Sequence, residues 1–197
     1  MAKLYFRYGA MSSGKSTLLL QVAHNYKQNN MKVLIIKPKI DTKGDNKIVS
    51  RIGLSMAADI LLENKQSIYD YLDIITKSAC LLVDESQFLN KKQVFELWKI
   101  SKDQDIPVIC YGLKTNFKGE LFEGSATLLA LADELEELKT ICSCGKTARF
   151  NARRINGEFT ITGDEVVIDN SSEVEYIPLC GKCYLKKVIN KSQKVSN

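Results

Sequence analysis

Residues 9–16 (GAMSSGKS) are typical of a loop that binds phosphate. Their pattern is G-x-x-x-x-G-K-[ST], in which backbone N–H groups surround phosphate oxygens. We expect Lys15 to supply a positive charge to the β- and γ-phosphates and Ser16 to supply an oxygen to Mg²⁺. A strand-like run precedes the pattern and a helical pattern follows it, which favours ATP binding over a chance glycine turn. The residues of this predicted site are Gly9, Ala10, Met11, Ser12, Ser13, Gly14, Lys15 and Ser16.

Two acids, Asp84 and Glu85, follow the apolar run at residues 81–83. We expect this run to form a strand next to the phosphate-binding strand, where Asp84 can hold the Mg²⁺ shell. Glu85 comes one residue later, at the exit of the strand. Its carboxylate can accept a hydroxyl proton or orient an attacking water. The alternative is that both acids are solvated residues at the start of a helix, and the phosphate-binding pattern favours the catalytic interpretation.

Four of the six cysteines form two close pairs, Cys142 with Cys144 and Cys180 with Cys183. Paired cysteines in a reducing compartment indicate metal ligands before disulfides. We therefore predict a structural Zn²⁺ with four thiolate ligands and no position for a catalytic water, the alternative being four unconnected thiols. Cys80 and Cys110 lie in apolar runs and are expected to be small buried residues.

The spacing of apolar residues predicts strands at residues 3–9, 32–38, 79–85 and 107–112, and helices at 15–28, 67–77, 91–103 and 128–135. Strands that alternate with helices indicate an α/β fold, in which a parallel sheet carries helices on both faces. Residues 39–56 and 113–126 lack this spacing, and we expect loops there, the second one mobile. Trp98 is expected in the core and His24, the only histidine, on the surface.

The alternation of strands and helices ends near residue 140. Residues 150–162 carry Asn156-Gly157 between two alternating runs, which predicts a β-hairpin. We therefore expect a nucleotide-binding α/β domain at 1–140, a zinc-stapled domain at 141–190 and a basic, disordered tail at 191–197.

The net charge of the 197 residues is +5, but residues 181–197 hold five lysines and no acid, so the rest of the chain is neutral. A neutral body argues against a broad nucleic-acid-binding face. No apolar run approaches the ~20 residues of a membrane helix, and the first residues lack the apolar core of a signal peptide. A cytoplasmic protein without a membrane or nucleic-acid partner is the expectation.

Four stretches in this order, GAMSSGKST, VDESQF (83–88), YGLKTNFKGELFEGS (111–125) and the cysteine pairs, make the chain resemble the type II thymidine kinases. The resemblance covers about residues 3–188. It implies transfer of the ATP γ-phosphoryl group to the 5′-hydroxyl of thymidine with Mg²⁺, a homotetramer, and inhibition by thymidine triphosphate. It also implies a small β-rich domain whose "lasso" loop closes over the base and is held at its ends by zinc.

By the same resemblance, Glu85 corresponds to the general base of the family, and Arg51 and Arg153 to basic partners of the phosphates. The positions that wall the nucleoside are Met11, Phe88, Leu113, Phe117, Phe122, Val167, Ile168 and Tyr176. Lys43 stands where the family often has arginine, and residues 169–172 replace the usual glycine pair of the lasso loop. Asn151 stands where a threonine or apolar residue would contact the thymine methyl group, which leaves acceptance of deoxyuridine open.

Two other functions remain as alternatives. The first is a nucleic-acid-dependent ATPase with a zinc ribbon, against which the neutral body and the lack of a basic, aromatic stripe count. The second is a non-catalytic nucleotide switch, which would tolerate replacement of Glu85 by glutamine.

Overall fold

The computed structural model describes residues 1–40, 46–163 and 174–190. Within these ranges the central element is a six-stranded parallel sheet in the order β5-β2-β6-β7-β1-β8. Its strands are β1 (Leu4–Tyr8), β2 (Val33–Pro38), β5 (Ile60–Leu62), β6 (Cys80–Val83), β7 (Val108–Gly112) and β8 (Glu134–Glu137). The parallel sheet that the sequence predicts is therefore confirmed.

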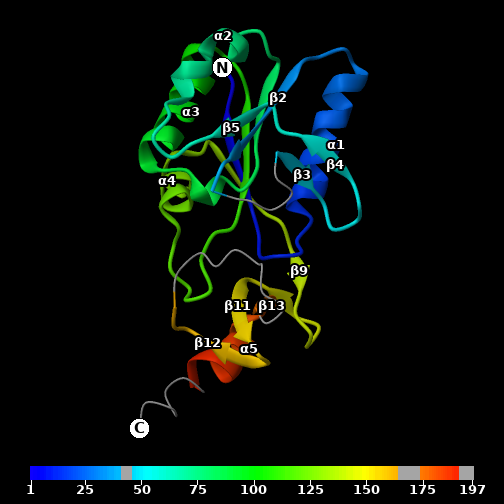
Figure 1. Ribbon diagram of the computed structural model, residues 1–197, viewed down its shortest axis with the longest axis vertical. Coiled ribbons are helices and arrows are strands. Elements are labelled where there is room, and N and C mark those ends of the chain that lie inside the picture. Colours follow the sequence, from blue (N-terminus) through cyan, green and yellow to red (C-terminus); the bar gives the residue numbers. More distant parts are fainter. Residues whose placement is uncertain (41–45, 164–173, 191–197) are drawn as a thin grey trace.

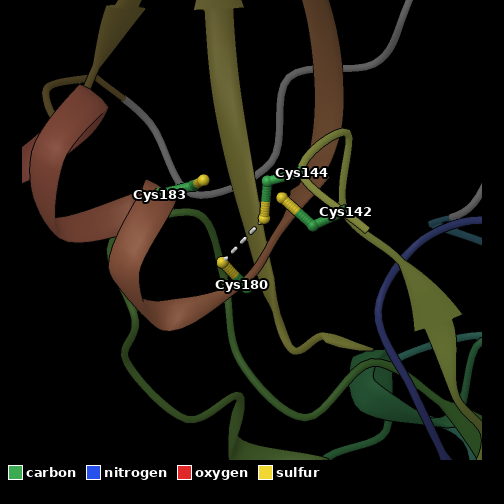
Figure 2. Close-up of side chains that lie close together, drawn as sticks. All are labelled: Cys142, Cys144, Cys180 and Cys183. Atoms are coloured by element: carbon green, nitrogen blue, oxygen red, sulfur yellow. Dashed lines mark hydrogen bonds between the residues drawn. The ribbon is translucent and has the colours of Figure 1, made fainter. Parts of the chain in front are cut away.

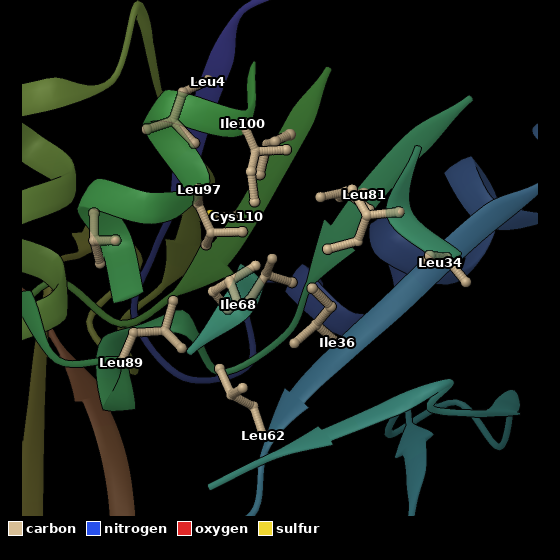
Figure 3. Packing of buried hydrophobic residues seen from close by; sticks show 14 of the residues in the cluster. Leu4, Leu34, Ile36, Leu62, Ile68, Leu81, Leu89, Leu97, Ile100 and Cys110 are labelled. Carbon is tan, nitrogen blue, oxygen red and sulfur yellow. The ribbon is translucent and has the colours of Figure 1, made fainter. Parts of the chain in front are cut away.

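Helices cover both faces of the sheet (Figure 1). α1 (Lys15–Gln28) packs on one face, and α2 (Leu72–Ile75), α3 (Lys91–Asp103) and α4 (Glu123–Leu131) pack on the other. Within β2, Leu34 and Ile36 belong to the core below α3, whereas Val33 and Ile35 belong to the core below α1. Figure 3 shows the first of these cores. Because both faces are buried, the strands are continuous apolar runs rather than alternating ones.

The order of the central strands corrects one expectation. β6, which ends just before Asp84 and Glu85, is not the neighbour of β1, because β7 lies between them. Neighbouring strands are about 4.8 Å apart, so β6 lies about 9–10 Å from β1. Parallel strands end at the same edge, so the segments after β1, β6 and β7 still meet there.

The boundaries near residue 130 are also corrected. The helix predicted at 128–135 begins and ends earlier in the structure, where α4 spans Glu123–Leu131. Glu134–Glu137 form the edge strand β8, which pairs with β1. Asp133 accepts a hydrogen bond from the Leu4 backbone N–H at 2.7 Å and aligns the two strands. Pairing with β1 thus overrides the helical pattern at the end of the predicted helix, residues 134 and 135.

Both predicted loops contain ordered elements. Residues 47–57 hold a short hairpin, β3 (Lys47–Val49) with β4 (Ser55–Ala57), where only a loop is expected. Thr115 and Leu121 form an isolated β-bridge, and residues 123–126 belong to α4. The predicted helix at 67–77 consists of a 3₁₀ turn, Ile68–Tyr71, followed by α2.

The residues after 140 form a small β-rich unit beyond the carboxyl edge of the main sheet (Figure 1). β11 (Phe150–Ile155) pairs with β12 (Glu158–Thr160) and β13 (Val174–Leu179), and the predicted hairpin turn has positive φ at Asn156 (50°) and Gly157 (83°). The other elements of the unit are β9 (Thr140–Ile141), β10 (Thr147–Ala148), α5 (Gly181–Tyr184) and the π-helical turn Leu185–Ile189. The unit has its own apolar cluster, separate from the two clusters that cover the main sheet.

Several single residues lie where the sequence places them. Cys80 and Cys110 are buried, Trp98 packs against the core below α3, and His24 is exposed. Among the helices of the described residues, none is long and apolar enough to cross a membrane.

Candidate active site

A cleft of about 260 Å³ opens at the carboxyl edge of the sheet. It is lined by residues 11–17 of the phosphate-binding loop and α1, by residues 49–52 of the β3–β4 hairpin, and by Glu85 and Leu113. The segments that follow β1, β6 and β7 therefore share one cavity, although they are far apart in the sequence.

The phosphate-binding loop connects β1 to α1 as its sequence predicts. Gly14 has a φ of 80°, a left-handed conformation that glycine adopts without strain, and it directs the chain into the helix. The Lys15 ammonium donates to the carbonyls of Gly9 at 3.0 Å and Ala10 at 2.9 Å. The positive charge is thus held over the loop, at the N-terminus of a helix that also favours anions.

Asp84 is 5% exposed and lies beside the start of α1. The hydroxyl of Ser16 lies 3.5 Å from Oδ2 of Asp84 and donates toward it. A hydroxyl and a carboxylate are hard oxygen ligands, which is the donor chemistry that Mg²⁺ requires. The two residues thus fit the ion, although β7 lies between β1 and β6.

Glu85 is half-buried and lines the cleft. Its backbone is left-handed, with φ 46° and ψ 39°, and it directs the side chain out of the line of β6 at the start of a 3₁₀ turn, Ser86–Phe88. Oε2 of Glu85 accepts a hydrogen bond from the Gln87 side-chain amide at 2.6 Å. The carboxylate is therefore held at the mouth of the site.

The two predicted arginine partners occupy different surroundings. Arg51 is exposed, lines the cleft and donates to the Ser12 hydroxyl of the phosphate-binding loop. Arg153 is 1% exposed, and its guanidinium lies 3.7 Å from the centre of the Phe117 ring. The structure thus brings Arg51 to the phosphate-binding loop and Arg153 to one of the predicted nucleoside-wall residues.

Some of the predicted nucleoside-wall residues also line the cleft, whereas others lie elsewhere. Met11 and Leu113 line the cleft. Phe88 and Phe122 meet edge to face at 5.8 Å between ring centres, on the 3₁₀ turn after Glu85 and at the start of α4. Phe117 is buried, and Tyr176 is half-buried opposite Arg153 in the small sheet. The last two predicted wall residues, Val167 and Ile168, lie outside the described residues. Lys43 and residues 169–172 also lie outside them.

The segment after β7 is built as a tight turn. Oδ1 of Asn116 accepts from the backbone N–H groups of Lys118 and Glu120, both at 3.0 Å. The Phe117 carbonyl accepts a hydrogen bond from the Tyr184 hydroxyl at 2.6 Å, which ties the turn to α5 of the small unit. Sequence reasoning missed this role of Tyr184, although the residue directly follows the last cysteine.

Asn151 is a second residue whose role the sequence did not reveal. It is 4% exposed on β11, and its Oδ1 accepts a hydrogen bond from the Met11 backbone N–H at 2.8 Å. Thr140 adds a hydrogen bond of 3.2 Å from its hydroxyl to the Ser12 carbonyl. The small unit therefore contacts the phosphate-binding loop directly.

Replacing Asn151 with leucine is expected to destabilise the protein by about 1–3 kcal/mol, because the Met11 N–H loses its acceptor. The KM for ATP should rise, since the phosphate-binding loop loses a support. Urea denaturation and initial rates over a range of ATP concentrations measure the two effects. Asn25→Leu, at an exposed position of α1, is the matched control. Unchanged stability and KM in the Asn151 variant would contradict this role.

The four cysteines of the two pairs come together between the loop after β9 and α5 (Figure 2). All four sulfur atoms lie within 4.8 Å of one another, and Sγ of Cys144 is 3.5 Å from Sγ of Cys180. Four sulfurs around a tetrahedral Zn²⁺ at about 2.3 Å are about 3.8 Å apart. The cluster thus has the donor set and the size for this ion.

The pKa values of these thiols differ in a way that suits a cation site. Desolvation opposes ionisation of Cys142, but hydrogen bonds from the backbone N–H groups of Cys144 and Cys180 prevail and lower its pKa to about 6. Hydrogen bonds with the sulfurs of Cys144 and Cys180 raise the pKa of Cys183 to about 12. The lowered pKa favours the thiolate of Cys142, and a bound cation would favour loss of the proton from Cys183.

Among solved structures, a replication initiator, DnaA, bound to AMPPCP and single-stranded DNA matches 70% of this chain and 40% of its own with a TM-score of 0.46 and 16% identity. A likeness at this level indicates neither fold nor function.

The sequence comparisons are far closer. The family model described as thymidine kinase matches residues 2–184. A thymidine kinase of Lactococcus lactis is 43% identical over 192 residues, with coverage of 96% of this chain and 100% of the relative. Thymidine kinases of Legionella pneumophila (46% identical, 91% of this chain and 88% of the relative) and Enterococcus faecalis (45%, 98% and 100%) match similarly. The chain belongs to the thymidine kinase family.

Proposed function

We propose that this protein transfers the γ-phosphoryl group of ATP to the 5′-hydroxyl of thymidine. The observation that supports it best is the shared cleft, in which the phosphate-binding loop lies opposite the Glu85 carboxylate. Membership of the thymidine kinase family gives the nature of the acceptor. A parallel sheet explains the arrangement, because it brings a donor site and an acceptor site to one edge.

On the donor side, the loop N–H groups and Lys15 hold the triphosphate. Ser16 and Asp84 are the residues that would hold Mg²⁺, which when bound neutralises charge on the phosphates. The transition state of phosphoryl transfer is loose, so most of the rate enhancement comes from positioning and charge stabilisation. Arg51 lies next to the loop and can add a further positive charge there.

On the acceptor side, Glu85 accepts the proton of the 5′-hydroxyl as the hydroxyl oxygen bonds to the γ-phosphorus. The bond from that phosphorus to the β-phosphate oxygen breaks in the same step, and ADP leaves. Met11, Leu113, Phe88 and Phe122 would enclose the nucleoside and exclude water, with Phe117, Tyr176, Val167 and Ile168 completing the wall. In this site Arg153 acts on the nucleoside side, because its guanidinium covers Phe117. Exclusion of water also protects ATP from hydrolysis.

The zinc that we propose for Cys142, Cys144, Cys180 and Cys183 has a structural role, since four thiolates leave no open coordination position. Its support is the close approach of the four sulfurs. It would pin the start of the small unit to α5, which follows the segment expected to close over the base. The homotetramer, the cytoplasmic location and the absence of a nucleic-acid or membrane partner stay predictions.

A panel of acceptors with ATP labelled at the γ-phosphate tests the proposal. Thymidine should yield labelled thymidine monophosphate, whereas deoxycytidine and deoxyadenosine should yield little product. The rate with deoxyuridine relative to thymidine measures how strictly the site recognises the methyl group of thymine. ATP consumption that single-stranded DNA stimulates and thymidine does not would favour the nucleic-acid-dependent ATPase instead.

A further inference from the structure

Gln87 uses both ends of its side-chain amide near the cleft. The residue is 2% exposed and lies in the 3₁₀ turn after β6. Its Nε2 donates to Oε2 of Glu85 at 2.6 Å, and its Oε1 accepts from the Leu113 backbone N–H at 3.0 Å. One buried amide therefore joins the proposed base to the first residue after β7.

The surroundings hold this amide firmly in place. Oε1 of Gln87 lies so close to Gly112 that a Cβ added there would be only 2.9 Å away. The Ser86 hydroxyl donates to the Tyr111 carbonyl at 2.9 Å, which fixes the 3₁₀ turn to the end of β7. A tightly packed amide loses little further freedom when the substrates bind, so it is suited to orient a neighbouring group.

Glu85 needs such an orienting group. Its side chain has three rotatable bonds, and its left-handed backbone leaves it at the mouth of the cleft. The Gln87 hydrogen bond engages Oε2, so the carboxylate can present Oε1 to an acceptor hydroxyl. Hydrogen bonds that a carboxylate accepts are shorter and stronger than those between neutral groups, and the bond from Gln87 to Glu85 is 2.6 Å long.

We propose that Gln87 is a positioning residue for phosphoryl transfer. It holds the Glu85 carboxylate and Leu113 in one geometry, so that the base and the nucleoside wall are aligned together. This inference rests on the proposed role of Glu85 as the base.

Gln93 provides a comparison within the same chain. It is also 2% exposed, but among the described residues its amide bonds to backbone groups alone. Nε2 donates to the carbonyls of Glu63 (2.9 Å) and Gln66 (3.0 Å), and Oε1 accepts from the Asn90 N–H (3.2 Å). Gln93 thus stabilises the start of α3. Its loss should lower stability without changing kcat.

The test uses Gln87→Met, Gln93→Met and Glu85→Gln, together with the double variant at positions 85 and 87. Gln87→Met should lower kcat by about 10- to 100-fold, because small misplacement of a reacting group is that costly. The KM for ATP should stay within about twofold, since the hydrogen bonds of the Gln87 amide go to Glu85 and Leu113 and not to the phosphate-binding loop in the described residues. In the Glu85→Gln background, Gln87→Met should cost less than about a further twofold, because the residue acts through Glu85. Gln93→Met should lower the melting temperature and leave kcat unchanged.

Each outcome has one meaning. Unchanged kcat in Gln87→Met, or losses that multiply in the double variant, would overturn the inference while leaving Glu85 as the base. Full activity of Glu85→Gln would overturn the proposed base and this inference together. Should Gln87→Met fail to fold, Gln87→Glu replaces it, because the introduced carboxylate keeps an acceptor for the Leu113 N–H and repels the Glu85 carboxylate. This second variant should also lose kcat, and normal kcat would contradict the proposal.

Discussion

The Glu85→Gln variant is expected to lose about 10²- to 10⁴-fold in kcat with thymidine, the usual contribution of a general base. Glutamine has nearly the same shape and can still bond to Gln87, so the cleft should keep its form. What it lacks is the capacity to accept the proton of the 5′-hydroxyl. The KM for ATP should change little, because Lys15 and the phosphate-binding loop are untouched.

Steady-state rates and equilibrium binding of an ATP analogue measure these two effects separately. Glu134→Gln is the matched control, since this exposed glutamate on β8 pairs with Lys3 at the surface. Water screens an exposed ion pair of this kind, so neither the rate nor the stability should change noticeably. Wild-type turnover in Glu85→Gln would instead favour the non-catalytic nucleotide switch.

Removal of the metal from the four-cysteine cluster is expected to abolish activity with thymidine. Structural zinc contributes about 10–16 kcal/mol of apparent binding energy in zinc-finger peptides, which is comparable to the whole stability of a domain. Without the ion, α5 would lose its attachment to the loop after β9. Tyr184 lies in α5, so its hydrogen bond to the Phe117 carbonyl should be lost as well.

Metal analysis of the purified protein should find about one zinc per chain. Cys180→Ser should lose that zinc, expose the residues after 140 to limited proteolysis and lower the melting temperature. Cys110→Ala is the control, because this buried thiol lies in the main core and the variant should retain its zinc. Metal-free protein that resists proteolysis and phosphorylates thymidine normally would remove the structural role of the metal.

The sequence predicts those features that depend on neighbouring residues. The phosphate-binding loop needs particular residues at fixed spacing, and its structure follows the pattern from Gly9 to Ser16. The buried strands are equally clear, because burial on both faces leaves uninterrupted apolar runs such as β2. The Asn156-Gly157 turn is of the same kind, since both residues readily adopt positive φ.

Features that depend on partners far along the chain were beyond this reasoning. The position of β7 between β1 and β6 is set by how the crossovers pack, and no residue in those strands marks it. Asn151 and Met11 are 140 residues apart in sequence, so nothing local indicates their hydrogen bond. Gln87 did carry a signal, because a polar residue two positions after the proposed base is a candidate for contact with it.

The position of β7 between β1 and β6 has a consequence for which acceptor alcohol the site can take. Because β7 lies between β6 and β1, Leu113 follows β7 at a position between the phosphate-binding loop and Glu85. Leu113 therefore borders both substrates at once, and substitutions there should alter the choice of acceptor as well as the alignment of the acceptor with ATP.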